Sequence, residues 1–148
     1  MKLLPKITAA ILLLFNGMGA MYGGLSLITS PNGDTLGLSV RLLTYTPFDS
    51  FIIPGIVLLI ANGLPSVFAL AAILSSYEKW AGMALLQGAI LIAWILVQVI
   101  LIRTVNVLHA VLVAVGIILI LIGYFENAHL RRNSLILRQK RRLEKMEH

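Results

Sequence analysis

The sequence predicts an all-α membrane protein, an antiparallel four-transmembrane-helix bundle with a basic cytoplasmic C-terminal helix or tail. Three observations support this fold class. Hydrophobic residues make up 59% of the 148 and charged residues only 12%, about half of the charged share usual in soluble domains. The charges also leave four long apolar intervals. Finally, most lysines and arginines fall on one side of a four-span arrangement.

The composition excludes several classes of protein. Cysteine is absent, which excludes a disulfide framework, thiol redox chemistry, an iron–sulfur cluster and a cysteine-ligated zinc site. The high hydrophobic fraction excludes intrinsic disorder, because disordered segments have the opposite composition.

Four intervals without Asp, Glu, Lys or Arg are each long enough for about 20 apolar residues, the length that crosses hydrocarbon. The backbone must satisfy its own hydrogen bonds in lipid, so each interval is expected to be a helix. We predict spans near 7–29, 51–75, 80–102 and 105–125, in a transmembrane domain at 1–128. A cleaved signal peptide is the alternative for the first interval, because small residues follow Ile7–Phe15 and cleavage would fall near Gly23.

Basic residues predict the orientation. Lys2, Lys6, Lys79 and the tail lie on one side of the four spans, and only Arg41 and Arg103 lie on the other. Cytoplasmic segments carry the excess of lysine and arginine. Both termini are therefore expected in the cytoplasm, with the protein in a bacterial inner membrane.

The link between the first two spans, about 30–50, is long and external. It ends in the sequence T-P-F-D at Thr46–Asp49, a capping-box pattern with proline at the first helical position. We therefore predict that the second helix begins at Thr46. The apolar segment Leu36–Leu43 has three open alternatives: a segment flat on the outer surface, a lid over the bundle, or a plain loop.

Two prolines, Pro54 and Pro65, fall inside the second span. Each removes a backbone hydrogen bond, and Pro65 follows Asn62 and Gly63, so we predict a mid-membrane kink at that point. The freed carbonyl of Ala61 then needs another partner.

Each predicted helix has one stripe of small and polar residues. Gly19 and Gly23 make a GxxxG pattern in the first helix, and such faces allow close approach within the bundle or in a homodimer. The residues predicted to pack helices together are Gly19, Gly23, Gly24, Gly116 and Gly123.

The amides and the single imidazole within the spans are candidate ligand contacts. Gln98 and His109 are expected at similar depth across a hairpin, in the outer-leaflet half. One interpretation is hydrogen bonding between helices. The other is a pocket for a lipid headgroup or a quinone, with Trp94 as a stacking wall. The candidate ligand-binding residues are Trp94, Gln98, His109, Asn62, Asn16 and Gln87.

The chain lacks the sequence patterns of catalysis. His109 is far from the other histidines and from any buried carboxylate, so no metal site is predicted. Nucleophile-elbow, phosphate-loop and dinucleotide motifs are absent. Proton-coupled transport usually needs an embedded carboxylate, and the interiors of the predicted spans contain none. No catalytic residue and no obligatory cofactor are therefore assigned.

The tail at 129–148 mixes apolar with basic residues. It is predicted as an amphipathic helix on the cytoplasmic leaflet, or else as a solvated tail, and nucleic acid is not an expected partner. The residues predicted to meet the membrane surface are Arg131, Arg132, Arg138, Lys140, Arg141 and Arg142.

Several short motifs together resemble small uncharacterised bacterial four-helix membrane proteins of DoxX-like architecture. They are Asn16–Gly24, Pro47–Asp49, Ile53–Gly55, Asn62-Gly63, Gln87-Gly88, Trp94-Ile95, Gln98 and His109. The resemblance covers about residues 7–125 and implies a four-helix bundle. Some DoxX-like proteins are subunits of quinone-linked oxidoreductases, which makes a quinone a ligand that the resemblance implies.

The expected function is that of a non-catalytic accessory or structural membrane component, with a lipid or quinone pocket in its outer-leaflet half. A subunit of a quinone-linked oxidoreductase is the alternative, and a small-solute transporter is the third hypothesis. The expected partners are membrane lipids and a second copy of the chain or a larger membrane complex.

Overall fold

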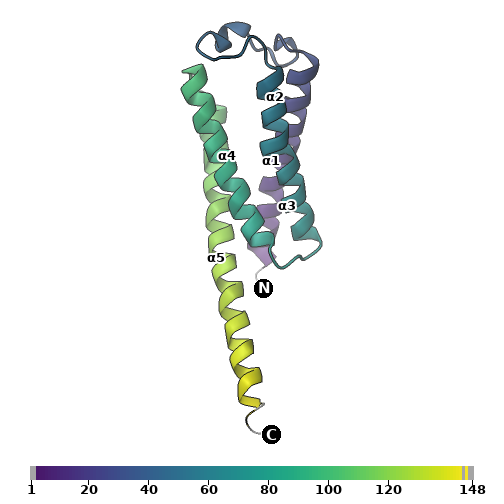
Figure 1. The fold of residues 1–148 in the computed structure, drawn as a ribbon, viewed down its shortest axis with the longest axis vertical. Helices are drawn as coiled ribbons and strands as arrows, with labels where there is room; N and C mark the ends of the chain where they lie inside the picture. The colour runs from purple at the N-terminus through teal and green to yellow at the C-terminus, as the bar shows by residue number, and fades with distance from the viewer. Residues whose placement is uncertain (1–2, 145, 147–148) are drawn as a thin grey trace.

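A computed structural model describes residues 3–144 and 146, and this part of the chain is helical without a strand (Figure 1). Its elements are α1 (Leu3–Thr29), η1 (Asp34–Leu36), η2 (Val40–Leu43), α2 (Ile52–Leu58), η3 (Leu59–Gly63), α3 (Leu64–Leu74), α4 (Trp80–Ile102) and α5 (Val107–Glu144). Four helical segments are long and apolar enough to cross a membrane, with α2, η3 and α3 forming one of them. The chain is thus a multi-pass membrane protein by the length and composition of its helices, as the sequence predicts.

The helices associate as two pairs. One pair is α1 with the continuous segment α2–η3–α3, and the other is α4 with α5. The pairs are joined where α3 packs on α4 and α1 packs on α5. In Figure 1 the N-terminus lies beside the short α3–α4 link, and α5 passes both and continues beyond them.

Glycines bring each pair into backbone contact. A Cβ added to Gly24 would lie 2.9 Å from the carbonyl oxygen of Gly55, and one added to Gly123 would lie 2.5 Å from that of Ala81. Gly116 similarly faces Gly88. The predicted packing roles of Gly24, Gly116 and Gly123 agree with these contacts.

Gly19 has no packing role within the bundle, and a homodimer through the GxxxG face stays a prediction. Gly19 is exposed, and a Cβ added to it would meet no described atom within 4 Å. Gly17 lies on the packed face instead, where an added Cβ would be 3.2 Å from the Cβ of Ser66. A Cβ added to Gly23 would meet only the tip of the Leu58 side chain, at 3.3 Å. The closely packed face of α1 therefore includes Gly17 and Gly24 rather than the GxxxG pair. Gly17 and Gly19 point to nearly opposite sides, because two residues of a helix turn through about 200°.

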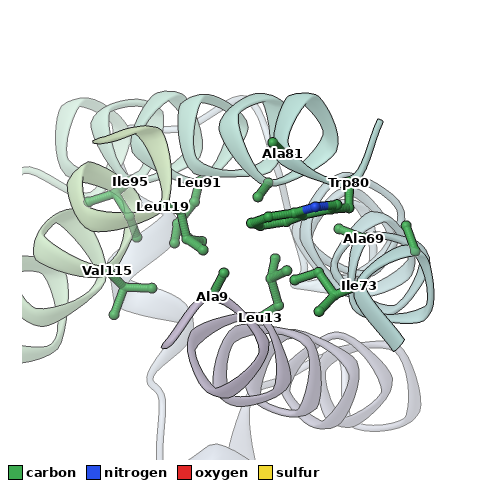
Figure 2. Close-up of a cluster of buried hydrophobic side chains, with 12 residues drawn as sticks. Ala9, Leu13, Ala69, Ile73, Trp80, Ala81, Leu91, Ile95, Val115 and Leu119 are labelled. Carbon is green, nitrogen blue, oxygen red and sulfur yellow. The ribbon is translucent and has the colours of Figure 1, made fainter. Parts of the chain in front are cut away.

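The larger apolar core joins the two helix pairs around Trp80, the first residue of α4, which is 1% exposed. Figure 2 shows the Trp80 indole lying between Ala81 on one side and Leu13 and Ile73 on the other. The core continues between α4 and α5 through Leu91 and Leu119. Lys6 covers the Trp80 ring, with its Nζ 5.7 Å from the ring centroid.

Pro65 stands directly after a π-helical turn. In this turn, η3, the backbone N–H of Leu64 donates to the carbonyl of Leu59 five residues earlier. The wide turn accommodates the proline ring, which would clash with the carbonyl of Ala61 in a regular α-helix. A π-turn lies at the point where the sequence predicts a kink, and the kink itself stays a prediction. Pro54 lies in the first turn of α2, where it removes no helical hydrogen bond.

The predicted helix start at Thr46 is wrong, because α2 begins at Ile52. The Thr46 Oγ1 accepts from the backbone N–H of Phe48 at 3.2 Å and donates to the carbonyl of Leu43 at 2.9 Å. Threonine hydroxyls stabilise such local turns as readily as helix caps. The motif therefore closes a loop six residues before the helix.

The link between α1 and α2 folds into a small apolar cap at one end of the bundle. Leu43 and Phe51 are buried against Leu27 of α1. Tyr45 reaches the α4–α5 link, where the Arg103 guanidinium lies 4.4 Å from its ring centroid. Of the three alternatives, this arrangement agrees best with a segment folded over the bundle.

Helix α5 continues without a break from the bundle into the basic segment. Residues 131–144 are exposed on every side. The predicted boundary between the transmembrane domain and the tail, at 128/129, thus falls inside one straight helix.

Candidate functional site

Two hydrogen bonds link buried polar side chains from different helices. The Asn16 Nδ2 of α1 donates to the Ser66 Oγ of α3 at 2.8 Å. The Gln87 Nε2 of α4 donates to the Asn62 Oδ1 of η3 at 3.3 Å. Asn62 and Ser66 are 0% exposed, Gln87 1% and Asn16 4%, so all four lie inside the helix bundle.

The π-turn explains why one segment, α2–η3–α3, forms hydrogen bonds to two different helices. Residues four apart share a face in a regular α-helix. Here Asn62 bonds to α4, whereas Ser66, four residues later, bonds to α1. The extra residue in the wide turn rotates Asn62 away from Ser66. Pro65 causes this turn and thereby directs the Asn62 amide toward Gln87.

The amide pair retains unused hydrogen-bonding capacity. The Asn62 Nδ2 and the Gln87 Oε1 are buried and have no partner among the described residues. Two amides that share one hydrogen bond keep a donor on one and an acceptor on the other, whichever way the groups are turned. A buried polar atom without a partner costs about 1–3 kcal/mol, so a molecule that satisfied both atoms would be stabilised here.

An apolar groove between α3 and α4 reaches Gln87, one member of this pair. Its volume is about 260 Å³. The lining residues are Pro65, Phe68, Met83, Leu86, Gln87 and Ile90. Gln87 is the polar residue among them. The residue with the unpaired acceptor, Oε1, therefore also lines the groove. The volume is slightly below the usual range for drug-sized ligands, which favours an aliphatic chain with a small polar head.

The structure does not bring the predicted residues of the outer half together. His109 lies in the first turn of α5, where its Nδ1 accepts from the backbone N–H of Asn106 at 3.2 Å. In return, the Asn106 Oδ1 accepts from the backbone N–H of His109 at 3.2 Å. The imidazole therefore serves as a reciprocal helix cap instead of lying well inside a span.

The other two members of the predicted group lie on α4. Gln98 is half-buried and makes no hydrogen bond to His109. The indole Nε1 of Trp94 is buried without a hydrogen-bond partner among the residues that the structure describes. A ligand contact for Trp94, Gln98 or His109 stays a prediction. The polar side chains from different helices that meet beside the groove are instead Asn62 and Gln87.

Two polar features were missed by the sequence reasoning. Ser66 is the partner of Asn16, and its four-residue spacing from Asn62 is a misleading signal, because the π-turn directs the two residues toward different helices. Lys6 is 8% exposed, and its Nζ lies 3.5 Å from the Ser76 Oγ. Its sequence signal is weak, since a lysine just before a span usually marks only the boundary.

The chemistry available at the candidate site is hydrogen bonding and apolar contact. Among residues 3–144 and 146, no group of three or more His, Cys, Asp or Glu is arranged to hold a metal ion. The chain matches no protein-family model, no curated protein and no solved structure. The DoxX-like resemblance therefore stays a prediction, and the functional argument depends on the site itself.

Proposed function

We propose that this protein is a non-catalytic accessory component of a bacterial inner membrane that binds a membrane amphiphile between α3 and α4. In this proposal the four helices are antiparallel, and both termini face the cytoplasm. The apolar part of the ligand occupies the groove, and its polar head reaches the Asn62–Gln87 pair.

One observation carries the proposal: Gln87 lines the groove and holds a buried oxygen without a partner. Pockets for small molecules combine a mostly apolar wall with a few placed polar groups, and Gln87 is the polar residue in the otherwise apolar lining of this groove. Gln87 lies seven residues into α4, about 11 Å along the helix from its start. The polar head would therefore bind near the middle of a bilayer about 30 Å thick. The site is deeper than the outer-half pocket expected from sequence.

The unpaired atoms favour one ligand chemistry. A hydroxyl both donates and accepts, so it can satisfy the free acceptor and the free donor of the amide pair. An oxidised quinone offers only carbonyl acceptors and would leave the amide acceptor unpaired. A quinol or a lipid with a free hydroxyl is therefore the favoured ligand class.

The test is the identity of small molecules that remain bound after gentle extraction from the membrane. Native mass spectrometry is expected to find a hydroxyl-bearing amphiphile on the wild-type protein. Gln87→Leu removes the acceptor while keeping similar bulk, and bound ligand should fall about tenfold. Gln98→Leu is the matched control, the same exchange on the same helix outside the groove, and should retain the ligand.

Equal ligand on all three proteins, or none on any of them, would overturn the proposal. A redox partner that co-purifies with the wild-type protein would instead favour the quinone-linked subunit.

A further inference from the structure

The cytoplasmic stalk, which we define as residues 127–144 of α5, extends far beyond the bundle. Helix α5 has 38 residues, about 57 Å of helix, whereas a span needs about 30 Å. Asn127 lies beside Gly82, and Leu130 is the last residue of this helix that packs against the apolar core. Beyond that level Figure 1 shows the stalk running alone, away from every other helix.

One face of the stalk combines positive charge with an apolar residue. Arg131, Leu135, Arg138 and Arg142 follow one another at spacings of four, three and four, which places them on one side of the helix. A shallow groove of about 300 Å³ lies along this side, lined by Leu135, Arg138, Gln139 and Arg142. We call this face the arginine stripe.

The isolated stalk is electrostatically unfavourable. Residues 131–144 contain six basic residues and one acidic residue. Arg138 and Arg142 are four apart, and like charges at this spacing destabilise a helix. A helix without packing partners is already marginal in water. An anionic partner would relieve the repulsion and cover the exposed Leu135.

The lipid surface is a poor candidate for that partner. Arg138 lies eleven residues beyond Asn127, about 16 Å along the helix, whereas charges are screened over about 8 Å at physiological salt. No proline or glycine interrupts the stalk where it would have to bend. Ile136 and Leu143 are seven residues apart and share one face, but Arg132 and Lys140 flank that face and Leu137 points away from it, so the stalk has only a narrow apolar face to lay on lipid.

Protein fits better than the other macromolecules. A second copy of the chain would place two strongly basic stalks together, which charge repulsion opposes. The phosphate backbone of a nucleic acid would neutralise the arginines, but it has no apolar group that could cover Leu135. We propose that the arginine stripe docks an acidic amphipathic helix of a partner protein, with carboxylates opposite Arg131, Arg138 and Arg142 and an apolar side chain against Leu135.

The experiment measures binding of a fluorescent helical peptide of about 20 residues to the full chain in zwitterionic nanodiscs. The peptide carries glutamates flanking a leucine at the spacing of the stripe. Arg138→Glu/Arg142→Glu is expected to weaken binding at least tenfold, because it opposes like charges across the contact. Arg132→Glu/Lys140→Glu makes the same change of net charge on other faces and should weaken binding less than about threefold.

A peptide with lysines in place of glutamates should regain binding to Arg138→Glu/Arg142→Glu. Circular dichroism of each variant checks that the helix persists. Equal loss in the two double variants would overturn the proposal, since it would show a response to net charge alone. Tighter binding of the wild-type chain to anionic vesicles or to an RNA oligonucleotide than to the peptide would overturn it as well. This result is independent of the α3–α4 groove, so it leaves the proposed ligand site untouched.

Discussion

At the scale of single residues, the Asn62–Gln87 pair contributes less to stability than its burial suggests. Hydrogen bonds between membrane helices contribute only about 0.6 kcal/mol on average. Each amide here also has an atom without a partner, which subtracts from that contribution. A weakly stabilising buried pair is more easily explained by binding than by folding, because apolar residues of the same size would pack at least as well.

This energetic balance predicts an unusual double-variant result. Gln87→Leu alone removes the shared hydrogen bond and leaves both polar atoms of the Asn62 amide without a partner, but it also removes the unpaired Gln87 oxygen, so it should lower the free energy of unfolding by up to about 1 kcal/mol. Asn62→Leu/Gln87→Leu removes both amides and should recover most of that loss. Reversible unfolding in mixed micelles measures both values. Asn62→Leu alone completes the comparison, and a double variant that loses the sum of the losses in Asn62→Leu and Gln87→Leu would show that the amides act independently.

At the scale of helices, the packed faces are set by backbone contact at particular glycines. A Cβ on Gly123 would lie 2.5 Å from a carbonyl oxygen of α4, and backbone cannot yield as a flexible side chain can. Gly19 has open space beside it and lies on an exposed face. Two glycines in spans thus have opposite roles, which composition alone does not distinguish.

We predict opposite effects of one substitution at these two glycines. Gly123→Ala should destabilise the α4–α5 pair by about 1–3 kcal/mol through overpacking. Gly19→Ala should be neutral or stabilising by up to about 1 kcal/mol, because alanine is the better helix former. Unfolding in micelles gives both values. Loss of a dimer in Gly19→Ala, seen by light scattering, would instead show that the GxxxG face joins two copies.

The elements also show how far the sequence predicts this fold. Gaps between charges place the spans, and Pro65 after Asn62-Gly63 marks the irregular turn, since both signals are local. The inward faces are harder to predict, because lipid and protein interior are equally apolar and hydrophobicity no longer separates them. Gly17 and Gly19 show this, as both are small and only one is packed.

The same reasoning explains the errors at polar residues. The Thr46 hydroxyl and the His109 imidazole satisfy backbone groups nearby in the chain, a use that depends on where the chain turns. The Asn62–Gln87 contact depends instead on the rotation introduced by a π-turn. The sequence therefore predicts both amides as candidate residues, but only the fold shows that they pair.

At the scale of the whole molecule, the arrangement of charge predicts which parts face which side of the membrane. The α3–α4 link and the stalk lie toward one end of the bundle, and the apolar cap at 30–51 lies at the other (Figure 1). Lys6 belongs to the first end, because its Nζ lies 3.5 Å from the Oγ of Ser76 in the α3–α4 link. The first of these ends carries most of the lysines and arginines. Because basic residues prefer the cytoplasm, we expect the cap to face outward and the stalk to face inward.

The absence of cysteine makes this topology directly testable. Thr35→Cys places a single thiol in the cap, and Ser134→Cys places one in the stalk, both at exposed positions. In spheroplasts, a membrane-impermeant maleimide should label Thr35→Cys before lysis and Ser134→Cys only after it. Their local hydrogen bonds are to Ser30 and to the Arg131 carbonyl, so neither exchange disturbs the bundle. Labelling of both thiols before lysis would place cap and stalk on one side, which four crossings with a cytoplasmic C-terminus do not allow.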